Sequence, residues 1–86
     1  MLSKEIVIMN KTGLHARPAS EFVKAAAAFK SAITIEFKEK RINAKSILHV
    51  LSSGIAAGST IMLSAEGEDE EQAVETLSDV IARFEE

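Results

Sequence analysis

The sequence of 86 residues predicts an α+β fold, a two-layer open-faced sandwich in which helices cover one face of a four-stranded antiparallel sheet. Two observations lead to this class. Short segments with strand-like patterning alternate with segments of helical periodicity in the order βαββαβα. Two of the helical segments are long and amphipathic, and one face of an antiparallel sheet supplies the apolar surface that both need. Because a chain of this length has room for one core, we expect a single domain over residues 1–86.

The first strand and the first helix are expected within residues 2–30. Residues 2–9 contain a short β-branched run, which predicts a well-buried strand: Ile6, Val7, Ile8 and Met9. Residues 10–13 are typical of a turn, and from Ala16 to about Lys30 apolar residues recur with helical spacing: Ala19, Phe22, Val23 and Ala26. Pro18 fits this helix only in the first turn, where its missing N–H costs nothing. This places His15 at or next to the N-cap.

A hairpin and a short helix are expected next. Apolar residues alternate with polar ones in a half-buried strand: Ile33, Ile35 and Phe37. Residues 39–40 predict a tight turn, and residues 41–44 a short returning strand. Ser46 is the expected N-cap of a brief helix, and Gly54 is its expected C-cap. The apolar residues of this helix are Ile47, Leu48, Val50 and Leu51.

The last strand and the last helix complete the expected order. Residues 60–65 predict a strand with three side chains on one face: Ile61, Leu63 and Ala65. Gly67 turns the chain, and Asp69 and Gln72 have the spacing of a capping box. An unbroken helical stripe follows: Ala73, Val74, Leu77, Val80, Ile81 and Phe84.

Composition excludes several classes of protein. Hydrophobic residues make up 47% of the chain and charged residues 27%, as in an ordinary soluble globular domain. The chain has no cysteine, so disulfides and thiolate metal sites are excluded. We find no signal-peptide pattern, and the longest apolar stretch is far short of a membrane span. We therefore expect a cytoplasmic protein without membrane insertion.

The charge is distributed unevenly along the chain. The net charge is −3, but residues 66–86 carry nine acidic residues against a single arginine, whereas residues 1–65 have a net charge of +5. Such a split can steer a basic face toward an acidic partner, although the acids of the tail can equally serve to solvate an exposed helix. Nucleic acid is not an expected partner, because the isoelectric point is about 5.4 and the chain has no Trp or Tyr.

The most informative segment is Gly13-Leu14-His15-Ala16-Arg17-Pro18. It places a nucleophilic nitrogen of His15 at a helix N-terminus, where unpaired N–H groups favour an anion. Arg17 can present a planar fork to phosphate oxygens, and phosphoryl transfer depends mainly on positioning and charge neutralisation. The alternative is that His15 only caps the helix and Arg17 is an ordinary surface charge.

No metal site and no cofactor are expected. The two histidines are isolated from each other and from any cysteine, and His49 is predicted to have a surface role in the short helix. The acidic run at residues 68–71 is better explained as the first turn of a helix, where the helix dipole favours negative charge.

Three blocks of the sequence resemble the HPr family, the histidine-containing carriers of the sugar phosphotransferase system. Residues 13–19 are similar to the phosphorylation-site signature of the family, residues 43–48 to its second-helix segment, and residues 64–70 to its last strand and turn. The resemblance implies a sheet with the strand order 1-4-2-3. It also implies that phosphorylated enzyme I, which uses phosphoenolpyruvate, phosphorylates His15 on Nδ1. Arg17 would clamp the phosphoryl group, and the amides of Ala16 and Arg17 would lie near it.

The resemblance further implies partners and the surface that meets them. The phosphoryl group would pass to enzyme IIA domains for sugar uptake, and the chain, expected to be a monomer, would turn nothing over by itself. The docking surface of the family corresponds here to Ala16, Ser20, Ile47, Leu48 and Leu51. Ser20 is a departure, since relatives often have alanine there. For the apolar residues of the short helix the alternative is packing in the core. We expect some of these side chains to be buried in the core and others to be exposed for docking.

Ser46 resembles a serine that an HPr kinase/phosphorylase modifies in many Gram-positive relatives, where a catabolite-control regulator is a further partner. The alternative is a simple N-cap serine. Position 49 is His where those relatives commonly have glycine, which puts this regulation in doubt but not the carrier role. The alternative function is a regulatory HPr-like module, of the nitrogen-branch or catabolite-control type, that acts mainly through protein contacts.

Overall fold

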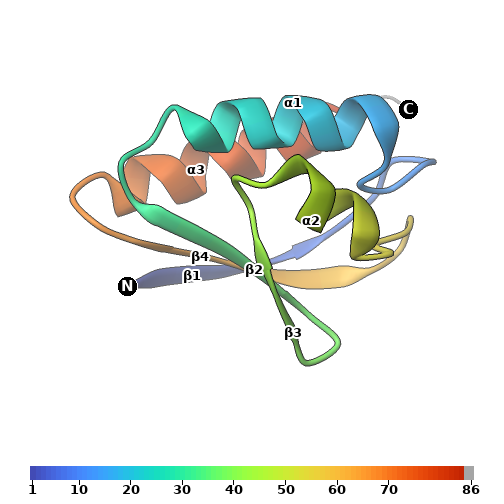
Figure 1. Cartoon of the computed structure of the whole chain (residues 1–86), viewed down its shortest axis with the longest axis horizontal. Coiled ribbons are helices and arrows are strands. Elements are labelled where there is room, and N and C mark those ends of the chain that lie inside the picture. The colour runs from blue at the N-terminus through green and yellow to red at the C-terminus, as the bar shows by residue number, and fades with distance from the viewer. Residues whose placement is uncertain (85–86) are drawn as a thin grey trace.

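The seven expected elements follow one another in the expected order, as the computed structural model in Figure 1 shows. The structure describes residues 1–84. The elements are β1 (Leu2–Val7), α1 (Ala16–Ala27), β2 (Ala32–Phe37), β3 (Lys40–Asn43), α2 (Ile47–Ser52), β4 (Thr60–Glu66) and α3 (Glu70–Ala82). The strands form one antiparallel sheet in the order β1-β4-β2-β3, which confirms the order implied by the resemblance.

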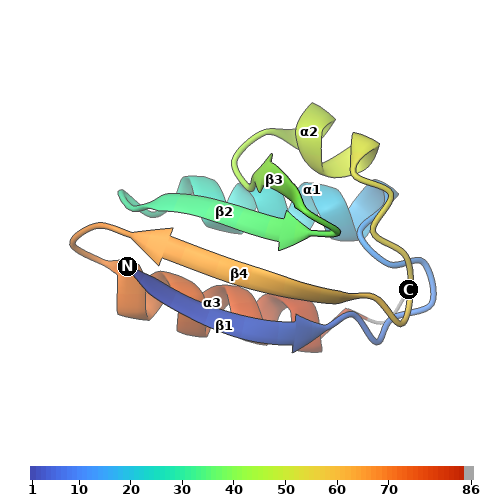
Figure 2. The ribbon, with the colours of Figure 1, turned by 90° about the horizontal axis from the view of Figure 1, so that it is seen from below.

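The two long helices and the sheet form two layers. Figure 2 shows the sheet in front of α1 and α3, which lie side by side on one of its faces and leave the other face open. Because side chains alternate along a strand, one set from each strand meets the helices. The largest fully buried side chains come from both layers: Ile8, Leu14, Phe22, Ile35, Ile42, Ile61, Leu63 and Leu77. The short helix α2 lies at the β3 edge and packs against α1 and β3.

The prediction of a well-buried first strand is wrong. β1 ends at Val7, and both Val7 and Met9 are exposed, whereas only Ile8 of this run is fully buried. The reason is the position of β1 at the edge of a sheet that is covered on one face. A side chain that points away from the helices there has no layer to pack against.

Several predicted boundaries also move. α1 ends at Ala27 and not near Lys30, because the N–H groups of Ala28 and Phe29 donate to carbonyls three residues back and tighten the last turn. The hairpin turn lies at residues 38–39, not 39–40. Its two residues, Lys38 and Glu39, have φ angles of 48° and 67°, as in a type I′ turn. Such turns usually contain Asn or Gly, and neither residue is present here to indicate the position of the turn. At the end of α2 the C-cap is Ser53, and Gly54 is the residue after it.

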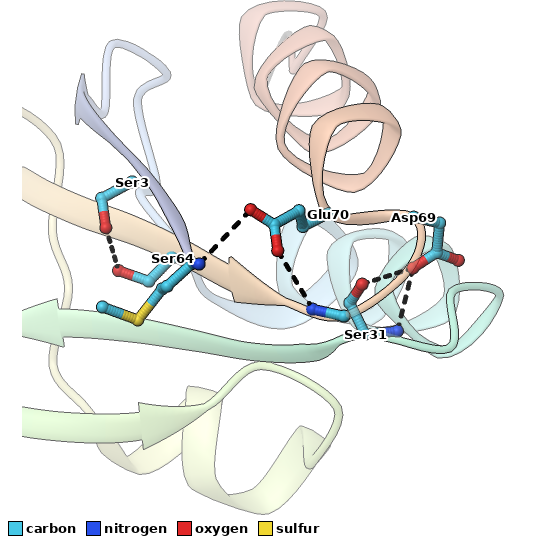
Figure 3. A network of polar contacts seen from close by, with 7 residues as sticks. Ser3, Ser31, Ser64, Asp69 and Glu70 are labelled. Atoms are coloured by element: carbon cyan, nitrogen blue, oxygen red, sulfur yellow. Dashed lines mark hydrogen bonds and ion pairs between the residues drawn. The ribbon is translucent and has the colours of Figure 1, made fainter.

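The predicted capping box is wrong as well. Asp69 is the N-cap of α3, but its carboxylate makes no capping hydrogen bond. It accepts instead from the N–H groups of Lys30 and Ser31, each at 2.9 Å, and from the hydroxyl of Ser31, as Figure 3 shows for Ser31. The hydrogen bond from the Ser31 side chain, followed by that from the Lys30 backbone, lowers the pKa of Asp69 from 3.8 to about 2. This carboxylate ties the start of β2 to the start of α3.

Asp69→Asn is expected to lower the free energy of unfolding at neutral pH, because an amide accepts these three hydrogen bonds less well than a carboxylate. A carboxyl group whose pKa is depressed on folding stabilises the fold above its ordinary pKa and loses that effect as the pH falls through the folded value. The difference from the native chain should therefore be full above about pH 5 and shrink as the pH falls from 3.8 to about 2.

Urea unfolding at a series of pH values measures this difference. Asp79→Asn is the matched control, since Asp79 is an exposed residue of the same helix. Equal destabilisation by the two substitutions, or a difference that does not change with pH, would contradict the role of Asp69.

Candidate functional site

The segment that precedes α1 is fixed to the segment that follows α2. The side-chain amide of Asn10 donates to the carbonyl of Gly13 at 2.9 Å and closes a turn. The N–H of Leu14 then donates to the carbonyl of Ile55 at 3.0 Å, and the Leu14 side chain is buried in the core. These contacts determine where α1 begins, and therefore where His15 lies.

Gly13 is required by this contact for two reasons. Its φ angle is 65°, in the left-handed region that side chains disfavour. A Cβ at this position would lie 2.5 Å from the Ile55 carbonyl oxygen and 2.7 Å from backbone atoms of Ala56. The two segments can approach this closely only because position 13 has no side chain.

His15 is the N-cap of α1, in agreement with its predicted place. Its backbone is extended, with φ −134° and ψ 152°, its side chain is exposed, and it makes no capping hydrogen bond. Ala16, the first residue of the helix, has a φ of 48°. A left-handed alanine costs about 1–2 kcal/mol, and strained residues of this kind gather at functional sites. Nothing in the sequence signals this conformation, because alanine is an ordinary helix residue.

The N-terminus of α1 is electropositive. The first amides of a helix have no carbonyl partner within the helix and carry the positive end of its dipole. The first turn of α1 contains no acidic residue, and Arg17 is exposed there. The first turn of α3, by contrast, holds Glu70 and Glu71. Pro18 lies in the first turn of α1 as predicted. The positive end of the α3 dipole is therefore compensated by acidic side chains of its own first turn. At the start of α1 no such side chain is present, so the positive end of the dipole can attract an external anion.

α2 is held by a set of short polar contacts around Asn43. Ser46 is its N-cap, and the Ser46 hydroxyl accepts from the N–H of His49 at 3.3 Å. The Asn43 carbonyl accepts from the Ser46 N–H at 3.1 Å, and the Asn43 side chain accepts from the Lys45 N–H at 3.0 Å. His49 is exposed, as predicted, but its Nδ1 also accepts from the Asn43 N–H at 3.0 Å. This last bond was not signalled by the sequence.

The predicted docking residues are all on the surface. Leu48 is 77% exposed, and Ile47 and Leu51 are 38% and 37% exposed, whereas Val50 of the same helix is completely buried. Ala16 and Ser20 of α1 are exposed as well. Figure 1 shows α2 beside the N-terminal half of α1, with which it packs. An apolar surface on α2 thus accompanies the histidine at the start of α1.

Neither a cluster of metal ligands nor a membrane-spanning helix is present in residues 1–84. These residues bring together no group of three or more His, Cys, Asp or Glu side chains that could hold a metal ion. Within the same part of the chain, no helix is long and apolar enough to cross a membrane.

An exposed histidine at an anion-attracting helix start, on an open-faced sandwich of this topology, defines the class of small histidine phosphocarriers. The family model described as "PTS HPr component phosphorylation site" matches residues 2–83. The chain belongs to the HPr family, whose members are phosphocarrier components of the phosphotransferase system.

Individual relatives agree with this assignment. The phosphocarrier protein HPr of Buchnera aphidicola subsp. Schizaphis graminum is 49% identical over 85 residues, 99% of this chain and 100% of the relative. The HPr-like protein Crh of Halalkalibacterium halodurans is 49% identical over 77 residues, 90% of this chain and 92% of that one. The crystal structure of HPr-C-His from Thermoanaerobacter tengcongensis is 50% identical and superposes with a TM-score of 0.93, covering 95% of this chain and 92% of that chain.

Gly13→Ala is expected to destabilise the fold more than Gly54→Ala. Both glycines have a positive φ, 65° and 74°, but a Cβ at Gly54 would meet no atom within 4 Å. Gly54→Ala should therefore cost about 1 kcal/mol from backbone strain alone, and Gly13→Ala about twice as much or more. Urea unfolding of both variants measures the difference, and equal losses would show that the contact with Ile55 imposes no steric requirement.

Proposed function

We propose that this protein accepts a phosphoryl group on Nδ1 of His15 from phosphorylated enzyme I and passes it to enzyme IIA domains during sugar uptake. The observation that carries the proposal is the exposed His15 side chain, which makes no capping hydrogen bond although it stands at the N-cap of α1. The ring is therefore available for chemistry at a point where the backbone favours an anion.

The chemistry follows from this placement. The lone pair of Nδ1 attacks phosphorus, and the new N–P bond forms as the bond between phosphorus and the donor breaks. Charge then accumulates on the phosphoryl oxygens, where the amides of Ala16 and Arg17 and the guanidinium of Arg17 neutralise it. The reverse sequence with an acceptor protein releases the group, so the chain carries the phosphoryl group and has no turnover alone.

The partners are recognised by a common surface, consisting of Ala16, Ser20, Ile47, Leu48 and Leu51. Its support is the exposure of three large apolar side chains on a helix that packs beside α1. Ser46 lies immediately before Ile47 and Leu48, so a phosphate added to it by an HPr kinase/phosphorylase would place about −1.5 to −2 charges beside this surface. The capping bond from the His49 N–H gives Ser46 a structural role in addition.

A regulatory function through protein contacts is the second candidate. The similarity to the HPr-like protein Crh favours it. The exposed His15 favours the carrier, because contacts alone do not require a nucleophile at this position. Phosphoryl transfer to an enzyme IIA domain separates the two functions, since only the carrier needs it.

We propose that the carrier works as a monomer in the cytoplasm. A single copy presents both His15 and the apolar surface of α2, so the proposed site needs no second chain. A further solved structure, 50% identical to this chain, is described as an HPr dimer from Thermoanaerobacter tengcongensis. A dimer of this chain would have to leave His15 accessible to be compatible with transfer.

Enzyme I and phosphoenolpyruvate are expected to add one acid-labile, base-stable phosphoryl group to the protein. His15→Ala should abolish this labelling and leave the fold intact, because the side chain is exposed and takes no part in capping. His49→Ala is the matched control and should keep full labelling. Labelling with isotopic phosphoenolpyruvate measures both, and a fully labelled His15→Ala protein would contradict the proposal.

Arg17→Ala is expected to slow transfer from enzyme I roughly 10- to 100-fold, because neutralisation of the developing charge is a large part of phosphoryl-transfer catalysis. The loss of stability should be small, since an exposed arginine contributes little to folding. Lys40→Ala, at an exposed basic residue of β3, is the control. Rapid-quench measurement of transfer in both directions tests the role, which rates within about twofold of the native chain would refute.

A further inference from the structure

A second basic site lies away from His15, at the β3 edge of the sheet. A hollow of about 480 Å³ is lined by the start of β2, by β3, by the segment after β3 and by α2. Its polar lining consists of Thr34, Arg41, Asn43, Lys45 and His49, and its remaining residues are apolar. Within residues 1–84, no acidic residue lines this hollow. The hollow is an open depression of the surface and not an enclosed cavity.

His49 contributes a donor with a fixed identity. Because Nδ1 accepts from the Asn43 N–H at 3.0 Å, the proton of the neutral ring is on Nε2. That nitrogen is the donor the imidazole can offer to a ligand in the hollow. The bond to Asn43, a residue that also lines the hollow, fixes the ring against β3.

Lys45 and Arg41 contribute the charge. The ammonium of Lys45 donates to the carbonyl of Phe29 at 2.7 Å, which uses one of its three protons and holds the group at the hollow. Arg41 is largely exposed and makes a long contact of 3.8 Å with Glu36. An exposed pair of this kind is weak, so the guanidinium can turn to a ligand at little cost.

We propose that this hollow binds the phosphate group of a small phosphomonoester, whose organic part lies against Ala32, the exposed apolar residue of the lining. Arg41 of β3, Lys45 of the following segment and His49 of α2 all line the hollow, and a terminal phosphate offers three oxygens and up to two negative charges to such donors. A carboxylate offers only two oxygens and one charge. The site does not depend on the proposed carrier function, since no residue of α1 lines it.

The test is a titration of the whole chain with phenyl phosphate, followed by NMR through the amides of Thr34 and Asn43 and the ring of His49. We expect saturable chemical-shift changes at these three positions. The affinity obtained from them should fall as salt is added, because salt screens the attraction between the charges. Arg41→Gln should weaken binding about fivefold, and Lys40→Gln, which removes the same charge from the same strand outside the hollow, should change it less than twofold.

Inorganic phosphate, benzoate and phenol complete the experiment. Inorganic phosphate should shift the same signals with lower affinity, and phenol should not shift them. Shifts confined to His15 and Arg17, shifts that do not saturate, or equal weakening by the Arg41 and Lys40 substitutions would overturn the site. Binding of benzoate as tightly as phenyl phosphate would overturn its assignment to phosphate.

Discussion

The close approach of the segment before α1 to the segment after α2 is the constraint on which the functional part of the molecule depends. It consists of one backbone hydrogen bond from Leu14 to Ile55 and of a glycine that leaves room for it. The buried Leu14 side chain anchors the same segment in the core. Because α1 starts directly after this anchor, the position of His15 is fixed by the backbone rather than by contacts of its own side chain. The imidazole thereby remains available for chemistry.

The two longest helices treat their N-termini in opposite ways. α3 has acids in its first turn, and its N-cap carboxylate is occupied by the start of β2. α1 has neither, but has Arg17 and a left-handed Ala16 instead. The positive end of the α3 dipole is therefore compensated by acidic residues of the chain itself, whereas the positive end of the α1 dipole can attract an external anion. This contrast gives the histidine motif an electrostatic meaning beyond its sequence pattern.

The limited size of the domain leaves part of its apolar surface uncovered. α2 has six residues and sits at the edge of the sheet, so it can bury Val50 but not Leu48. α2 thus contributes three exposed apolar side chains, Ile47, Leu48 and Leu51, while the basic hollow lies at the β3 edge.

The sequence by itself determined the order of the elements, the N-cap positions of His15 and Ser46, and the strand faces at Ile35 and Leu63, because each depends on periodicity or on neighbours within a few residues. The motif around His15 also indicated the family. Only the tertiary structure decided the role of Asp69, whose partners are 38 and 39 residues away, the requirement for Gly13 and the bond from Asn43 to His49. The exposure of Val7 and the hollow at β3 were likewise decided there. These features arise from contacts between segments that are distant in the sequence. A local sequence pattern carries no information about which distant segment will pack against it.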